Sequence, residues 1–334
     1  MSFDPLTATA TDAQAQLAEG SLTSETLVQL YLSQIARYNS FFNAIIATAP
    51  EDLLYKRARE LDEERANGTV RGPLHGIPIL VKDNIGTVPA LGLPTTCGSL
   101  TPMDAKPKKN AEVINHLLAA GVILLGKANL SAGIIPITYE ADSAGPMAKS
   151  IQDLADLLDV LVDPAKTVIP EGGYGSAVNR SWDDIRIGVI EPEKWLFPHE
   201  IENFEQKATD QMLSEWKAAY EKLKGVVKVI KPVTLLSPGE ASEDGKKNIW
   251  DVFQSTFKAN LDEFLATVED SKVNTLQSLL EFNEKHAEQE LGQTVWILEV
   301  RKHKKAEYIR KITGLVKDVL GRNLAYFTLV DFVG

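Results

Sequence analysis

One lysine occupies a position from which it could act in catalysis. Lys82 follows a continuous apolar run, residues 77–81, and precedes Asp83 and Asn84. Such a run predicts a strand buried on both faces, which places the lysine at the strand's end. A lysine acts as a base only when its ammonium group is deprotonated, and burial favours this because it lowers the lysine pKa. Lys82 is our candidate catalytic residue, although a lone lysine at a strand end is typical of a solvated surface.

A nucleophile to accompany this base is harder to find. Ser131 has neither a base nor a nest of amides near it in the sequence, so we interpret it as a helix cap. Ser176 follows a glycine-rich stretch, residues 172–175, which is typical of a surface loop. An active hydrolase with a relocated serine is the least favoured of our interpretations.

Composition excludes several function classes. The 334 residues carry a formal net charge of -11, which disfavours binding to nucleic acid or to an anionic membrane surface. The basic run at residues 106–109 is interpreted as a solvated loop. His286 and Glu290 are four residues apart on an expected helix, but we interpret them as an exposed polar pair, and we expect neither a metal nor a cofactor.

Location is indicated by a few weak signals. Cys97 is the single cysteine, which excludes an internal disulfide and fits a reducing compartment. The first residues do not read as a signal peptide, and no apolar run approaches the roughly 18 residues of a membrane span. We therefore expect a cytoplasmic protein without membrane contact.

The elements around Lys82 alternate between helix and strand. Gly20 should end a first helix, Thr23 should cap a second, and a short strand at residues 44–47 should precede a helix that Pro50 opens. Further pairs are a helix capped by Asn110 with a strand at 122–125, and a helix at 151–161 capped by Ser150 with a strand at 185–190. This alternation predicts an α/β fold with a mixed, largely parallel sheet flanked by helices.

The later part of the chain is more helical and more charged. An apolar stripe that includes Met212 and Trp216 predicts a helix packed into the core, ended by Gly225 and followed by a strand at 226–230. Amphipathic helices are expected from Trp250 to Phe264 and over residues 275–286, and a last strand at 324–333 suggests a chain that has been cut short. We expect one truncated domain, 1–334, comprising portions 1–131, 134–236 and 237–334.

Three blocks occur in an order that is specific to one family. Residues 71–84 read RGPLHGIPILVKDN, residues 93–99 read LPTTCGS, and residues 125–131 read LGKANLS. Together they resemble the N-terminal half of the amidase signature family, as found in fungal and bacterial amidases. Residues 142–150 and 185–189 resemble later blocks of that family, so the resemblance is clear from about residue 7 to residue 189.

The resemblance implies hydrolysis of amide carbon–nitrogen bonds by a catalytic triad. In the family one serine attacks the carbonyl, a second serine held by a cis peptide bond relays a proton, and a lysine matched here by Lys82 acts as the base. The family's serine-bearing loops should follow the third block. Here Ser131 is followed within three residues by an apolar run, 134–137, that already belongs to the later block.

The central segment that bears both serines is therefore expected to be missing. We predict an amidase relative that is inactive as written, with a small-molecule amide as its substrate if any activity remains. The alternative is a noncatalytic binding or regulatory protein that uses part of the amidase scaffold. A base with no hydroxyl to activate accelerates nothing, so the two interpretations differ in whether the remaining scaffold folds and binds.

Overall fold

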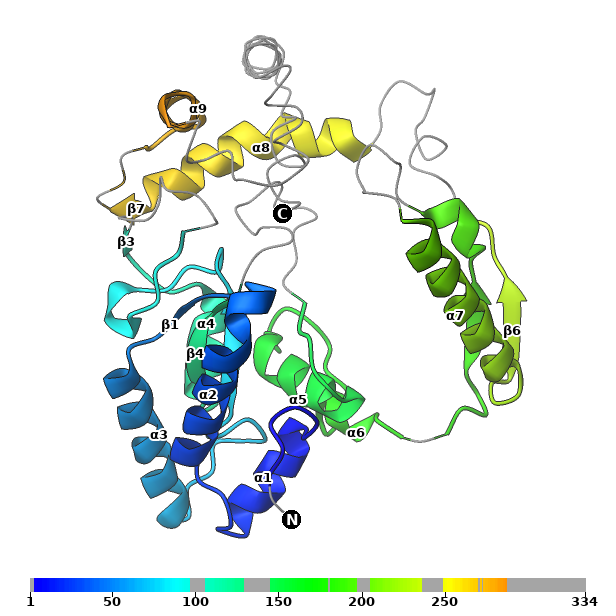
Figure 1. The fold of residues 1–334 in the computed structure, drawn as a ribbon, viewed down its shortest axis with the longest axis horizontal. Helices are drawn as coiled ribbons and strands as arrows, with labels where there is room; N and C mark the ends of the chain where they lie inside the picture. The colour runs from blue at the N-terminus through cyan, green and yellow to red at the C-terminus, as the bar shows by residue number, and fades with distance from the viewer. Residues whose placement is uncertain are drawn as a thin grey trace. The chain divides into compact units, whose positions relative to one another are not determined.

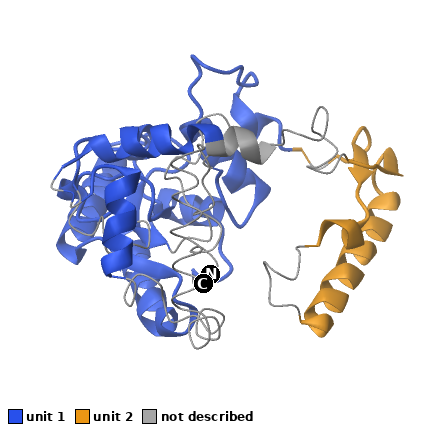
Figure 2. Ribbon diagram, turned by 90° about the horizontal axis from the view of Figure 1, so that it is seen from above, with its two compact units in different colours: residues 1–178, 250–334 blue, residues 179–249 orange. Residues whose placement is uncertain are grey.

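The computed structural model divides into two compact units, and each is described by itself (Figure 2). One unit comprises Met1–Val178 with Trp250–Gly334, and the other comprises Asn179–Ile249. The structure describes residues 3–96, 106–128, 145–179, 181–196, 205–235, 249–269, 271 and 273–286. Cys97, Ser131, Glu290, the junction at 131–134 and the expected strand at 324–333 lie outside these residues. The predicted portions of a single domain stay predictions.

Helices and short strands alternate through the first unit (Figure 1). In chain order the elements are α1 (Ala10–Ala18), α2 (Ser24–Phe42), β1 (Ile45–Thr48), α3 (Glu51–Ala66), β2 (Pro78–Lys82), η1 (Pro89–Leu91), β3 (Lys106–Pro107), α4 (Glu112–Ala119), β4 (Ile123–Ala128), α5 (Ile151–Leu161), α6 (Gly173–Ser176), α8 (Ile249–Ala266), β7 (Val268–Glu269) and α9 (Leu276–Lys285). The α/β class predicted from the alternation is confirmed.

A three-stranded sheet in the order β1-β4-β2 forms the centre of this unit. β4 is parallel to β2 and antiparallel to β1, so the sheet is mixed. The first five residues of β4 are buried, as its central position requires. Helices α2 and α3 pack against each other and contact β2 and β4, respectively. The core between these layers includes Val28, Leu61, Ile114 and Ile123, each fully buried.

The prediction that β2 is buried on both faces is wrong. Pro78 and Ile79 are only half-buried, and Leu80 is 39% exposed. Among the described strands β2 pairs with β4 alone, so it lies at an edge of the sheet. An apolar run indicates that a strand is poor in polar residues, but it does not indicate how many neighbouring strands or helices cover that strand.

Most of the predicted helix ends are confirmed. Thr23 and Ser150 accept hydrogen bonds from backbone amides three residues ahead, and each helix begins at the next residue. Gly20 follows α1 with φ of 71°, a left-handed conformation that suits glycine. The prediction that Asn110 caps α4 is wrong. Its Oδ1 accepts a hydrogen bond from the Val88 amide instead, and the residue before α4 is Ala111.

The second unit contains a two-stranded parallel sheet and one long helix. Its elements are β5 (Arg186–Val189), η2 (Pro192–Trp195), α7 (Gln206–Lys224) and β6 (Val229–Pro232). The helix and the strand predicted at 185–190 are confirmed, whereas the second strand begins at Val229 rather than at residue 226, and the packing predicted for α7 is not confirmed. No described residue of α7 is buried, and Met212 and Trp216 are 37% and 38% exposed. The apolar stripe exists, yet the described elements of this unit, η2 and β6, contact α7 without burying it.

The two C-terminal helices predicted from their amphipathic patterns are confirmed. Thr275 caps α9, and a separate cluster that includes Phe257, Leu261 and Leu276 packs α8 against it. Among the helices that the structure describes, none combines the length and apolar character needed to cross a bilayer.

Candidate functional site

Lys82 lies at the carboxyl end of β2, as the sequence predicted. In the parallel register it faces Ala128, the last residue of β4, and the Asp83 amide continues the pairing with a hydrogen bond of 3.1 Å to the Ala128 carbonyl. The side chain of Lys82 is half-buried and lines a cavity beside β2. The predicted position of Lys82 at a strand end is therefore confirmed, and its side chain is partly rather than fully buried.

The chain turns sharply after Lys82, and hydrogen bonds to Lys82 and Asp83 stabilise the turn. The Ile85 amide donates to the Lys82 carbonyl over 3.1 Å. The buried carboxylate of Asp83 accepts hydrogen bonds from the Thr96 amide and the Thr96 hydroxyl. Asp83 thus joins the start of the loop to its end, and we infer that it orients the strand end rather than acting on a substrate.

A second lysine in this region was missed by the sequence analysis. Lys127 is fully buried on β4 beside Val81, and its Nζ donates to the Ile85 carbonyl at 2.5 Å and the Thr95 hydroxyl at 3.2 Å. A lysine inside an otherwise buried strand is unusual and signals a specific polar partner. Lys127 holds the two ends of the 85–95 loop against β4 and so fixes the turn that follows Lys82.

Asn84, two residues after Lys82, lacks the hydrogen bonds that its burial demands. It is 2% exposed, and within the described part of the chain neither Oδ1 nor Nδ2 has a hydrogen-bond partner. A buried amide without partners is destabilising by about 1–3 kcal/mol for each unsatisfied group. The end of β2 therefore contains a polar group whose expected neighbours are not among the described residues.

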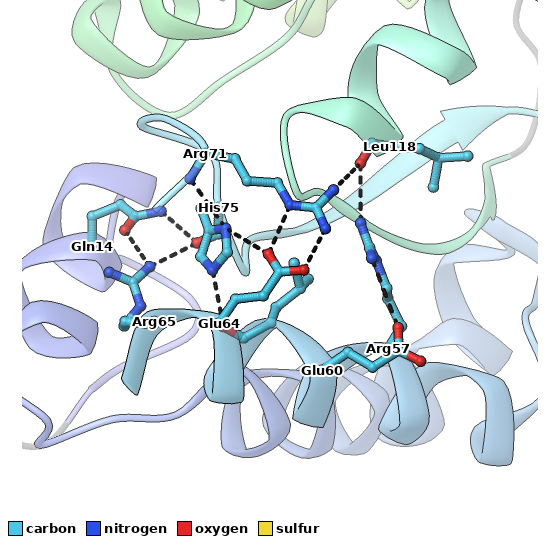
Figure 3. A network of polar contacts seen from close by, with 9 residues as sticks. Gln14, Arg57, Glu60, Glu64, Arg65, Arg71, His75 and Leu118 are labelled. Atoms are coloured by element: carbon cyan, nitrogen blue, oxygen red, sulfur yellow. Dashed lines mark hydrogen bonds and ion pairs between the residues drawn. The ribbon is translucent and has the colours of Figure 1, made fainter. Parts of the chain in front are cut away.

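A buried histidine precedes β2 in the same block (Figure 3). The Nε2 of His75 lies 2.9 Å from the Leu61 carbonyl, and its Nδ1 accepts a hydrogen bond from the Arg71 amide. The His75 carbonyl accepts from Gln14 and Arg65, which ties α1 and α3 to the entry of β2. This pattern fits a neutral ring that donates through Nε2 and accepts through Nδ1.

Acidification should destabilise the first unit through this histidine. Burial holds the pKa of His75 below its ordinary value of 6.5, despite the nearby carboxylate of Glu64. Its contribution to stability is therefore complete above pH 6.5, and it is lost as pH falls from 6.5 through the folded-state pKa, because the unfolded chain then binds the extra proton. We expect the free energy of unfolding to fall by up to about 1.4 kcal/mol per pH unit in that window.

Urea unfolding between pH 7.5 and pH 5.5 measures this effect. His75→Gln should be less stable at every pH but should show a flatter pH profile than the wild type. The range stays above the region where Glu64 titrates, since the hydrogen bond from Arg71 holds the Glu64 pKa below its ordinary value of 4.5. Parallel profiles for the wild type and His75→Gln would contradict the assignment.

The other candidate residues that the structure describes do not form a site with Lys82. The Ser176 hydroxyl donates to the Glu171 and Gly173 carbonyls within the short helix α6, so it is a local structural group. His286 stacks on Phe282 at the end of α9, with ring centroids 3.9 Å apart. Among the described residues, no group of three or more His, Cys, Asp or Glu side chains could hold a metal ion.

A cavity of about 420 Å³ opens beside Lys82. Its walls come from α1, α2, β2, β4 and α5, and from residues 147–149 that lead into α5. Most of the lining is aliphatic, and the exposed edge residue Leu80 contributes to it. The candidate catalytic lysine therefore faces a largely apolar space next to the sheet edge.

Comparison with known proteins identifies relatives of this chain. A family model described as Amidase matches residues 26–138. A probable amidase of Arabidopsis thaliana is 24% identical over 373 residues, which covers 85% of this chain and 69% of that protein. A putative amidase of Schizosaccharomyces pombe is 41% identical over 124 residues, which is 37% of this chain and only 21% of that protein.

A solved structure shares the fold. The native peptide amidase of Stenotrophomonas maltophilia matches with a TM-score of 0.69 and 24% sequence identity, covering 95% of this chain and 82% of that one. At this identity the likeness concerns the fold. The part of the chain that the family model matches contains Lys82, Asp83, Asn84 and Lys127.

Proposed function

This chain belongs to the amidase signature family, and from that premise we propose that it is a relative of carbon–nitrogen hydrolases that has lost its own catalytic serines. The proposal keeps Lys82 as the residue that matches the family's base in a Ser-cisSer-Lys mechanism. It assigns no nucleophile, because the family's serine-bearing segment has no counterpart between Ser131 and the apolar run at 134–137.

The observation that carries this proposal is the mismatch in length with the plant relative. That alignment extends over 373 positions but takes up 85% of this chain, and 85% of 334 residues is about 284. The difference, 373 less 284, is about 89 positions of the plant protein that have no counterpart here. Together, the unmatched positions equal the length of several strands and the loops between them.

Two structural observations support the same conclusion. β2 has one described partner strand, although its apolar sequence is typical of a strand that is covered on both sides. Asn84, two residues beyond the end of the pairing at Lys82, is buried with an unpaired amide. Both features are expected where a neighbouring segment has been removed and the remaining residues have kept their types.

Loss of the serines should abolish hydrolysis. A coupled nucleophile and base act as one unit, so that removing either member costs nearly as much as removing both. The oxyanion-binding amides of the family belong to the same missing loops, which removes the largest remaining source of rate enhancement. Lys82 would then be a base with no group to activate.

Turnover measurements on a panel of amides and aryl esters test the proposal. We expect the wild-type chain and Lys82→Ala to show the same background rate, with Lys56→Ala, on the exposed face of α3, as the matched control. Turnover that is abolished by Lys82→Ala and retained by Lys56→Ala would show that an active nucleophile is present. Sequencing the transcript across the codons for Ser131 to Ile134 would show whether the loss is present in the message.

A second candidate function, noncatalytic binding, is favoured by the cavity beside β2. A protein retained for binding must fold cooperatively, whereas a chain damaged by deletion should melt gradually and expose apolar surface. Thermal unfolding followed by near-ultraviolet circular dichroism distinguishes the two. A sharp transition would support the binding function, and a featureless spectrum at 20 °C would eliminate it.

A further inference from the structure

The cavity beside β2 has the size and walls of a small-molecule site. Its volume of about 420 Å³ lies within the range of roughly 300–1,000 Å³ that is usual for such sites. The apolar wall is built from five elements of the first unit. It includes Ala13 of α1, Leu27 of α2, Ile79 and Leu80 of β2, Leu125 of β4 and Leu157 of α5.

The charged groups of the wall are unequal in sign. Lys82 and Lys149 line the cavity, and Asp153 is the single acidic residue among its lining residues. The Asp153 carboxylate accepts hydrogen bonds from the Ala10 amide and from the Thr11 amide and hydroxyl, and the Lys149 Nζ donates to the Pro5 and Ala8 carbonyls. The formal charge of the lining, two lysines against one aspartate, is positive, in contrast to the net charge of -11 of the whole protein.

Tyr31 adds a hydrogen-bond donor to the charged residues that line the cavity. Its ring lines the cavity, and burial, reinforced by the nearby Asp153 charge, raises the pKa of its hydroxyl. The phenol therefore stays protonated at neutral pH and is able to donate a hydrogen bond. An aliphatic space with a positive balance and a phenol donor complements a molecule with an apolar tail and an anionic head.

We propose that this cavity binds a small amphipathic carboxylate, with its aliphatic tail against β2 and α5 and its carboxylate beside Lys82. The proposal rests on the second candidate function, in which the remaining scaffold is a binding protein. The apolar wall gives affinity through the area removed from water, at about 25 cal/mol per Å². Lys82 gives selectivity for the anionic head, because an ion pair beside a low-dielectric wall is stronger than one in bulk water.

Tail-matched ligands separate the two contributions. Decanoate, decanol and decyltrimethylammonium have the same tail and carry negative, neutral and positive heads. Calorimetric titration of the full chain below the micellar concentration of each ligand should give the tightest binding for decanoate. We expect decanoate to bind about tenfold more tightly than decanol, as one charge-assisted contact predicts.

Two substitutions locate the site. Lys82→Met removes the charge and keeps an unbranched apolar side chain, so it should lower the affinity for decanoate about tenfold and leave that for decanol unchanged. Lys56→Met, on the exposed face of α3, should change neither affinity. Ala148→Trp places a large ring on an exposed residue of the cavity wall, where it should weaken all three ligands without disturbing the core.

The ligand affinities test the proposed binding site independently of the turnover measurements. Equal affinities for the three heads, or a decanoate affinity that Lys82→Met and Lys56→Met change alike, would overturn it. Undiminished binding to Ala148→Trp would place the ligand elsewhere and would also overturn it. Because turnover is measured on the same preparations, a chain that neither binds nor hydrolyses refutes this site and leaves the loss of the catalytic serines intact.

Discussion

A hybrid chain that regains the missing segment should hydrolyse amides that the present chain leaves untouched. The hybrid inserts, between Ser131 and Ile134, the segment of the plant relative that follows its counterpart of residues 125–131; the plant protein has about 89 unmatched positions in all (373 less 85% of 334). Restoring a nucleophile and its oxyanion-binding amides beside Lys82 should accelerate hydrolysis by at least about 10⁶-fold over the uncatalysed rate, the lower end of the range for enzymes. Release of amine or aryl alcohol from an amide and ester panel measures it.

The control for the hybrid is the same insertion with Lys82→Ala. Because the base and the nucleophile act as a unit, this single change should remove about 10⁴-fold or more of the regained rate. A folded hybrid whose turnover is indifferent to Lys82 would contradict the assigned role, and a folded hybrid without turnover would contradict the proposed origin of the chain. Circular dichroism shows which hybrids have folded.

Local signals predicted the elements that position the site. Ser150 followed by Asp153 placed the start of α5, and the Ile151–Leu161 bounds of the helix agree with the prediction. The apolar run before Lys82 likewise placed the lysine at a strand end. These features depend on residues a few positions apart, so a single sequence contains them.

Features that depend on distant neighbours were predicted poorly. Asn110 has the residue type of a cap but bonds to the Val88 amide, 22 positions away in the chain. Trp216 lies on an apolar stripe that no described element of its own unit buries. Lys127 lies beyond the strand predicted at 122–125, and the acceptors of its Nζ, the Ile85 carbonyl and the Thr95 hydroxyl, lie 42 and 32 positions away in the chain.

Under the proposed function, the loss of one segment explains two of these errors. β2 was predicted to be covered on both faces, and α7 was predicted to be buried, because both sequences are apolar enough to belong to a larger core. Residue types fitted to a complete fold would persist after a deletion, whereas their neighbours would not. The two wrong predictions therefore follow from one cause under the proposed function, and the same cause accounts for the unpaired amide of Asn84.

A single methyl group at Gly126 should be enough to disrupt the central sheet. A Cβ at this position would lie 2.5 Å from the Ala47 carbonyl oxygen on β1 and 3.3 Å from Leu80 on β2. β4 is held between these two strands, so it cannot relieve the clash on one side without losing pairing on that side or packing on the other. We expect Gly126→Ala to lower the free energy of unfolding by about 3 kcal/mol, at the upper end for overpacking.

The matched substitution is Gly145→Ala, because a Cβ there meets nothing within 4 Å. It should change the free energy of unfolding by less than about 0.5 kcal/mol, as for other surface positions. Urea unfolding monitored by far-ultraviolet circular dichroism compares both variants with the wild type. Similar midpoints for the two variants would mean that β1 moves aside freely and is not a stabilising member of the sheet. A selective loss for Gly126→Ala would show that the β1-β4-β2 sheet is the cooperative centre of the unit, and that the end of β2 holds Lys82 in place only while this sheet is intact.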